Sequence, residues 1–174
     1  SQVGASSLNF NGGLVLANPG TIFSNNFIQG LNGAYVYSGG ALIDDQGQNL
    51  TIPQNLQGLS GYGLTNIPVA AGGAGYIGAP AVMILGGSGT GATAIAQVDF
   101  TTGVLTNIQI TSTGVGYLPD DVLNIQLLGG GYTEAAQLGV YRFGTNANTG
   151  GLTKLGAGTM TLSGTNSYGG LTTV

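Results

Sequence analysis

The side chains that could do chemistry are few, and the acidic ones fall in turns. Two adjacent pairs, Asp44 with Asp45 and Asp120 with Asp121, stand among turn-forming residues. Adjacent side chains of an extended chain point to opposite faces, so neither pair offers the two-carboxylate arrangement that acid–base hydrolysis needs. We interpret these residues as solvated turn residues. The alternative is a calcium site with oxygen ligands from Asp44, Asp45 and Asn49, although the glycine–aspartate repeat of calcium-binding β-rolls is missing.

The chain contains no histidine and no cysteine. Serine–histidine–aspartate and cysteine–histidine catalysis, disulfide bonds, and metals held by histidine or thiolate are therefore excluded. Arg142 and Lys154 are the only basic residues, and the net charge of −4 leaves no cationic patch for nucleic acid or an anionic membrane. We expect Lys154 to be a solvated edge charge or to contact a carbonyl oxygen. The sequence thus predicts a protein that is not an enzyme and has no cofactor.

Two kinds of glycine-containing motif could belong to a binding site, one for phosphate and one for a glycan. The loop at residues 86–91 is rich in glycine, but no lysine follows it and no helix is expected after it, which argues against a phosphate-binding loop. Tyr76 and Tyr117 each end a Gly-x-Gly-Tyr motif. We favour the interpretation that both rings pack over glycines inside the protein. The alternative is that both rings lie exposed on one face and bind a glycan.

The composition predicts many short strands joined by tight turns. Glycine accounts for 35 of 174 residues, charged residues for 5% and hydrophobic residues for 42%, and this hydrophobic content argues against disorder. No 11-residue window has a helical period without an interrupting glycine or proline, and no apolar run reaches the roughly 18 residues of a membrane-spanning helix. In the N-terminal part, the expected strands are residues 7–10, 14–16, 21–23, 27–28, 34–37 and 50–52.

Residues 63–98 and 104–140 look like two copies of one unit. Residues 64–67 and 105–108 are both Leu-Thr-Asn-Ile, and the two Gly-x-Gly-Tyr motifs follow at matching positions. The spacing between the copies is 41 residues at first and 43 later. A repeat of this length indicates a repeated supersecondary unit. Each copy predicts strands separated by glycine-rich turns.

The C-terminal residues 150–174 are organised as two short strands, at 159–163 and 170–174, with a turn-rich segment between them. Such a unit has too few apolar residues for a core of its own, so it must stack on further units. Its residue order resembles the autotransporter-associated β-strand repeat of bacterial surface and passenger proteins. The residues that carry this resemblance are Lys154, Gly156, Gly158, Leu162, Gly164, Asn166, Tyr168 and Thr173. Residues 39–52 resemble an upstream element of the same family, although here about 100 residues separate the two elements.

The resemblance implies a bacterial extracellular or cell-surface protein. Together with the strand pattern it predicts an all-β fold, with a β-solenoid body like a parallel β-helix made of residues 1–60 and 141–174. Residues 61–140 would form a small β module inserted into this body, similar to the glycine-rich insertions of very large bacterial surface proteins. The chain begins with Ser1 and no signal-like region precedes it, so we expect a mature or excised segment.

Neither end of the sequence has the polar cap that terminal coils of a solenoid need. We therefore expect copies to associate head to tail through strand edges, which produces an open filament. The residues expected at this contact are Leu8, Phe10, Leu171 and Val174. The predicted function is a structural subunit or repeat of an extracellular fibre, stalk or matrix protein. The alternative is a surface adhesin that binds glycans through Tyr76 and Tyr117.

Overall fold

The computed structural model describes residues 6–18 and 26–174. These residues form strands β1 to β17 and contain no helix, so the predicted all-β class is confirmed. The expected strand at residues 21–23 lies outside the described residues, as do residues 1–5. The described ranges accordingly contain no helix long and apolar enough to cross a membrane.

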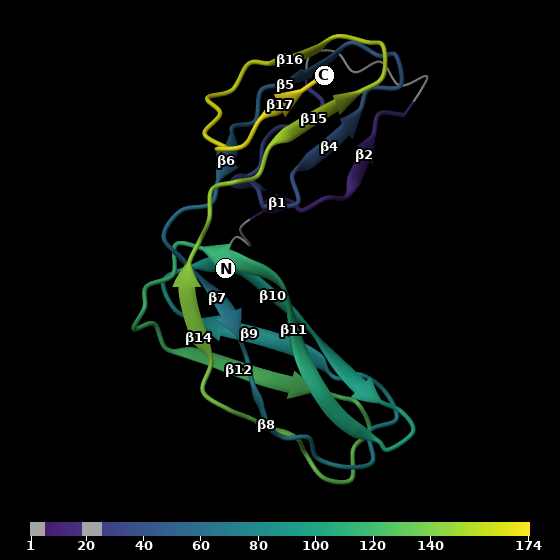
Figure 1. Ribbon diagram of the computed structural model, residues 1–174, viewed down its shortest axis with the longest axis vertical. Helices are drawn as coiled ribbons and strands as arrows, with labels where there is room; N and C mark the ends of the chain where they lie inside the picture. The colour runs from purple at the N-terminus through teal and green to yellow at the C-terminus, as the bar shows by residue number, and fades with distance from the viewer. Residues whose placement is uncertain (1–5, 19–25) are drawn as a thin grey trace. The chain divides into compact units, whose positions relative to one another are not determined.

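The chain divides into two compact units (Figure 1). Unit 1 consists of residues 1–59 and 147–174, and unit 2 consists of residues 60–146. Unit 2 is therefore an insertion within the chain of unit 1. The second boundary lies at Asn146 rather than at residue 140, because strand β14 pairs with β7 and so joins unit 2.

Among its described residues, unit 1 is built from short strands that pair only in parallel, in three small sheets with the orders β17-β15-β4-β2, β1-β3-β6 and β16-β5. The strands are β1 (Ser7–Phe10), β2 (Leu14–Leu16), β3 (Gly33–Val36), β4 (Ala41–Asp44), β5 (Leu50–Ile52), β6 (Leu56–Gly58), β15 (Leu152–Leu155), β16 (Met160–Leu162) and β17 (Thr172–Thr173). Six of them, β1, β2, β3, β5, β16 and β17, overlap segments where the sequence predicts strands. The strand expected at residues 27–28 is wrong, because the chain bends there.

The described chain of unit 1 visits its sheets in a recurring order. It passes from β1 to β2, then through β3, β4 and β5, then through β6, β15 and β16, and it returns to the four-stranded sheet at β17. Each pass places its strands in register on those of the previous pass; Ala34 of β3, for example, pairs with Leu8 of β1 and Leu56 of β6. Residues from successive passes therefore form columns.

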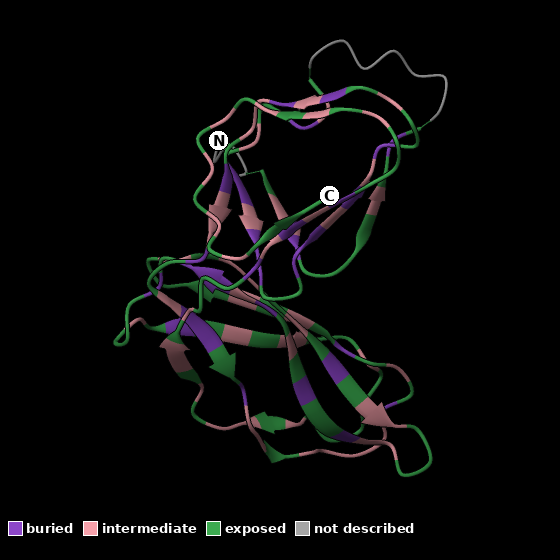
Figure 2. Ribbon diagram, turned by 45° about the horizontal axis from the view of Figure 1, so that its top comes forward, coloured by how far each residue is buried: buried purple, intermediate pink, exposed green. Residues whose placement is uncertain are grey.

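Alternation along these strands creates the core of unit 1. In β4, Ala41 and Ile43 are buried while Leu42 and Asp44 are only half-buried, and Figure 2 shows this banding along the strands. Each fully buried leucine or isoleucine contributes about 1.5–3 kcal/mol relative to exposure. The buried core residues are Phe10, Ala17, Ile28, Ala34, Val36, Ala41, Ile43, Leu50, Ile52, Leu56 and Leu152.

Unit 2 is antiparallel throughout. Its main sheet has the order β11-β10-β9-β12, and two smaller pairs join β13 to β8 and β14 to β7. Its core lies between these strands and includes Leu64, Ile67, Leu105 and Ile108. The strands are β7 (Tyr62–Asn66), β8 (Val69–Ala71), β9 (Ala81–Gly86), β10 (Thr90–Asp99), β11 (Val104–Val115), β12 (Leu123–Leu128), β13 (Gln137–Leu138) and β14 (Arg142–Thr145).

Candidate functional site

A buried ion pair joins two parts of unit 1 that are distant in the sequence. Asp45 follows β4, and Lys154 lies in β15, whose parallel register places it opposite Ile43. The Nζ atom of Lys154 is 2.6 Å from Oδ2 of Asp45, and the side chains are 9% and 0% exposed. The expectation of solvated charges at these positions is therefore wrong, because the strand register puts both in the interior. The expected contact of Lys154 with a carbonyl is present, since Nζ donates to the oxygen of Gly156 at 2.9 Å.

Backbone amides complete the surroundings of the Asp45 carboxylate. Its Oδ1 atom accepts hydrogen bonds from the N–H groups of Gly47 at 2.8 Å and Gly158 at 3.0 Å. Gly156 adopts φ +89°, and an added Cβ there would overlap Oδ1 of Asp45. Each residue of the Lys-x-Gly-x-Gly order thus has a physical reason. Lysine neutralises the carboxylate, and Gly156 makes room for it. Gly158 donates its N–H to the carboxylate at a point where a Cβ would overlap the Gln48 backbone.

Burial alone would raise the pKa of Asp45, since it disfavours the charged carboxylate. The hydrogen bond from Lys154, the N–H groups of Gly158 and Gly47, and the charge of Lys154 outweigh burial, so that the pKa is lowered from 3.8. The carboxylate is therefore ionised at neutral pH. Asp45 and Lys154 belong to successive passes of the chain through the sheets of unit 1, so their ion pair links one layer of the unit, formed by one pass, to the next.

The three oxygen-bearing residues of the alternative calcium site, Asp44, Asp45 and Asn49, are engaged with protein donors. The Asp44 carboxylate accepts hydrogen bonds from the backbone N–H and the side-chain amide of Gln46, at 2.9 and 2.6 Å. Asn49 accepts from the N–H of Thr159 at 3.0 Å, and Asp45 faces Lys154. These contacts use the oxygens that a calcium ion would need. Across residues 6–18 and 26–174, no group of three or more histidine, cysteine, aspartate or glutamate side chains is placed to hold a metal.

Asparagine side chains make a second kind of link between neighbouring layers of unit 1. Oδ1 of Asn55 accepts from the N–H of Thr165 at 2.7 Å, and Oδ1 of Asn166 accepts from the N–H of Leu56 at 2.8 Å. Asn166 also donates to the carbonyl of Gly164 at 3.1 Å. These amides bond the backbone at corners, where the chain leaves its strands and sheet hydrogen bonds are missing.

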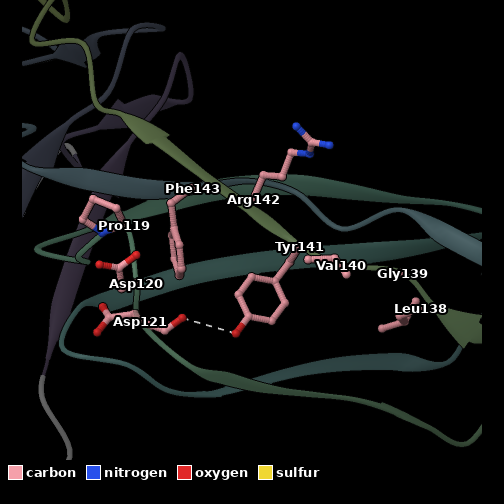
Figure 3. A pocket seen from close by; sticks show the side chains of 9 residues that line it. All are labelled: Pro119, Asp120, Asp121, Leu138, Gly139, Val140, Tyr141, Arg142 and Phe143. Carbon is pink, nitrogen blue, oxygen red and sulfur yellow. Dashed lines mark hydrogen bonds between the residues drawn. The ribbon is translucent and has the colours of Figure 1, made fainter.

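An open hollow of about 690 Å³ lies in unit 2 beside the start of β14 (Figure 3). Tyr141 and Phe143 project into it from the same side of the chain, while Arg142 points away on the other side, as alternation along an extended chain requires. Asp120 and Asp121 border the hollow at its other edge. The rings of Tyr141 and Phe143 meet edge to face, with centroids 5.7 Å apart.

Hydrogen bonds fix the walls of this hollow. The Tyr141 hydroxyl accepts from the N–H of Leu123 at 2.7 Å and donates to the carbonyl of Asp121 at 3.3 Å. The Asp121 carboxylate accepts from the N–H of Leu118 and from the N–H and hydroxyl of Ser88. The bond from Leu118, together with those from Ser88, outweighs burial and lowers the pKa of Asp121 from 3.8. The hollow therefore combines fixed aromatic rings with the ionised carboxylate of Asp121, and its one basic lining residue points outward.

Tyr76 and Tyr117 do not present an exposed face. Their side chains are only 3% and 4% exposed. An added Cβ at Gly130 would lie 2.8 Å from the Tyr76 ring, and one at Gly87 would lie 3.1 Å from the Tyr117 ring. The rings thus pack over glycine turns, as in the favoured interpretation, and they cannot offer an exposed surface to a sugar.

The four residues predicted for self-association lie in different environments. Leu171 and Val174 are 85% and 91% exposed, beside and after the edge strand β17. Leu8 is half-buried, and Phe10 is 2% exposed in the core of unit 1. Phe10 is therefore a core residue, because β1 turns this side chain inward.

Several residues that form these two sites were not identified from the sequence. The pairing of Asp45 with Lys154 had a weak signal, since Lys154 is the only lysine and lies in a chain with few acids. Tyr141 and Phe143 are separated by two positions, which places both side chains on one face of a strand. The other edge of the hollow had no local signal, because residues 119–121 reach it only through folding.

Comparison with known proteins provides one match. No curated protein and no solved structure matches the chain. Residues 152–174 match the model of the passenger-associated-transport-repeat family. They include β15, β16, β17, Lys154 and Asn166 of unit 1. This match links the C-terminal segment to the autotransporter-associated repeats of bacterial surface proteins.

Proposed function

We propose that the protein is a structural segment of a bacterial extracellular protein and that unit 1 is a stack of β-solenoid coils. The observation that carries this proposal is the recurring order in which the described chain visits three parallel sheets, with each pass in register on the last. Each coil of a solenoid contacts only its neighbours, so its stability grows by stacking. The passenger-associated repeat at residues 152–174 supports a surface location.

The links between layers suit a load-bearing role. Backbone hydrogen bonds join strands of neighbouring passes, and the corners are held by the Asp45–Lys154 pair and by Asn55 and Asn166. The ion pair is shielded from water, so salt screens it much less than a surface pair. In this proposal unit 2 is a module that the stacked coils display.

The ends of the four-stranded sheet supply surfaces for head-to-tail contact. β2 forms one edge, with Leu14 and Leu16 being 52% and 57% exposed, and β17 forms the other. Unpaired strand edges present backbone donors and acceptors that another strand can satisfy. We propose that β17 of one copy meets β2 of the next, with Leu171 and Val174 at the contact. Leu14 and Leu16 take the place of Phe10 at this contact.

Electron microscopy of the negatively stained chain, together with its mass in solution, tests this association. Open-ended filaments that lengthen with concentration are expected. The substitutions Leu171→Lys and Val174→Lys should abolish them, because charges at an edge oppose pairing. Val140→Lys is the matched control, since Val140 is 84% exposed but lies in unit 2. A chain that stays monomeric at every concentration would contradict the head-to-tail proposal.

A second candidate function, glycan binding by an adhesin, is favoured by the hollow beside Tyr141 and Phe143. Its volume of about 690 Å³ falls within the roughly 300–1,000 Å³ of small-molecule sites. Half-exposed rings can stack on a sugar, and the exposed Asp120 carboxylate can accept its hydroxyl groups. This site replaces the exposed Tyr76 and Tyr117 surface that was the alternative interpretation of the sequence.

A glycan array with the isolated chain tests this second candidate. Binding should be lost or strongly weakened by Asp120→Ala, which removes a carboxylate from the edge of the hollow and leaves the rings of Tyr141 and Phe143 in place. Arg142→Ala is the control, because this side chain points away from the hollow (Figure 3). Equal loss with both substitutions, or no glycan bound by the unmodified chain, would reject the candidate.

A further inference from the structure

The strand pairing of unit 2 runs almost entirely between its two halves. β10 pairs with β11, β9 with β12, β8 with β13 and β7 with β14, and in each pair one strand precedes residue 100 and the other follows it. Among the described pairings of unit 2, only Ile95 with Ala81 joins strands of the same half. Neither half can therefore satisfy its backbone hydrogen bonds alone.

The contacts between the halves are reciprocal. Tyr76 of the first half packs on Gly130 of the second, and Tyr117 of the second half packs on Gly87 of the first. β9 and β12 occupy matching positions of the sequence repeat, and they pair antiparallel with each other. The N–H of Tyr76 donates across the halves to Gly103, and that of Tyr117 donates to Tyr62. In a two-fold dimer, the same patch on each partner makes equivalent contacts in this way.

A short turn at residues 100–103 is all that connects β10 to β11. The Asp99 carboxylate accepts from the N–H of Thr101 at 2.9 Å and from the hydroxyl of Thr102 at 2.8 Å. Gly103 closes the turn with φ +67° and donates its N–H to the carbonyl of Asp99 at 2.8 Å. Opening this turn therefore breaks a few exposed hydrogen bonds, whereas separating the halves exposes the core of unit 2.

We propose that two copies of this chain exchange the segments on either side of this turn. Residues 1–99 of one copy then pair with residues 104–174 of the other, and every contact between the segments is made again across the two chains. Unit 1 takes part as well, because β15 and β16 follow the turn while their partners β4 and β5 precede it. Domain exchange is a low-cost route to dimers when a short hinge loop opens.

This exchange links two chains in a closed dimer and does not depend on head-to-tail stacking. Electrostatic repulsion between the exchanged halves of unit 2 is small, because they contain few charges. The first half contains Asp99, and the second contains Asp120, Asp121, Glu134 and Arg142. A closed dimer has a fixed mass, whereas head-to-tail contact produces open-ended assemblies. The two associations can therefore fail separately in experiments.

Disulfide formation between introduced cysteines can detect the exchange, because the chain has no cysteine of its own. Met83 of β9 lies opposite Gln126 of β12, and both are exposed. Chains with Met83→Cys and chains with Gln126→Cys are unfolded together, refolded at high concentration and oxidised. Exchange predicts a disulfide-linked dimer of the two variants on a non-reducing gel. One chain with both substitutions, which should form the bond internally, verifies the geometry.

Thr93→Cys mixed with Gln126→Cys is the negative control, because β9 lies between β10 and β12 and keeps these positions too far apart for a disulfide. A second variant lacks Thr101 and Thr102, so that β10 cannot turn back into β11. It should show twice the 17.2 kDa mass of the chain, with backbone amides of β10 and β11 still protected. The proposal is overturned if the doubly substituted chain forms its internal bond while the mixed single variants form no more linked dimer than the control.

Discussion

Replacing Lys154 with methionine would test the interior of unit 1 at one point. The substitution keeps a long apolar side chain but leaves the carboxylate of Asp45, which is 0% exposed, without its cation. Removing one partner of a buried ion pair costs about 3–5 kcal/mol, because the other charge remains desolvated and uncompensated. Two N–H groups still bond Oδ1 of Asp45, and they moderate this cost without replacing the charge.

Hydrogen exchange of backbone amides measures this loss separately in the two units. A cost of 3–5 kcal/mol corresponds to roughly 150- to 4,000-fold faster exchange of amides that open with unit 1. We expect this acceleration in β4 and β15, while β10 and β11 in unit 2 remain at wild-type rates and act as the internal reference. Arg142→Met, which removes an exposed cation from unit 2, is the matched control and should leave unit 1 unchanged.

The double variant Asp45→Asn with Lys154→Met distinguishes loss of charge balance from loss of packing. Asparagine at position 45 retains an oxygen that can accept from Gly47 and Gly158, and no unpaired charge remains. We therefore expect the double variant to exchange more slowly than Lys154→Met alone. The reasoning is refuted if Lys154→Met exchanges at the wild-type rate in β4 and β15, or if the double variant is no better than the single one.

Further substitutions and pH probe the same layers. The pKa of Asp45 is lowered from 3.8 in the fold, so its contribution to stability is present above pH 3.8 and is lost as the pH falls through the lowered value. Acid titration followed by circular dichroism should show this loss, and Asp45→Asn should reduce it, while the loss that comes from the lowered pKa of Asp121 in unit 2 remains. Asn166→Ala leaves the N–H of Leu56 without its acceptor and should cost about 1–3 kcal/mol in denaturant unfolding, with Thr161→Ala, on an exposed position of β16, close to neutral. Gly158→Ala places a Cβ against the backbone carbonyl of Gln48 and should lower the melting temperature clearly more than Ala157→Ser in the same turn; equal melting temperatures would contradict this close approach.

Much of the local structure, namely strands and turns, could be predicted from the order of residues. Short runs of strand-forming residues between turns predicted β1, β2, β3, β5, β16 and β17, and in β1 and β16 polar and apolar residues also alternate, because side chains of a strand point to alternate faces. The frequent glycines marked turns, and Gly103 and Gly156 adopt positive φ that other residues rarely adopt. The absence of histidine and cysteine excluded whole classes of catalytic site before any folding was considered.

Only the tertiary structure decided which distant residues meet. The burial of Asp45 and Lys154 depends on the register of β4 against β15, and the chain between these strands contains the whole of unit 2. Phe10 and Tyr117 look suitable for contacts with partners, yet their strands and turns direct both into the core. Pairing between strands is set by the summed fit of many weak contacts, so it cannot be inferred from the few residues that later form the site. The sequence therefore determined the strands and the chemistry that this chain lacks, and folding determined where its few charges and aromatic rings act.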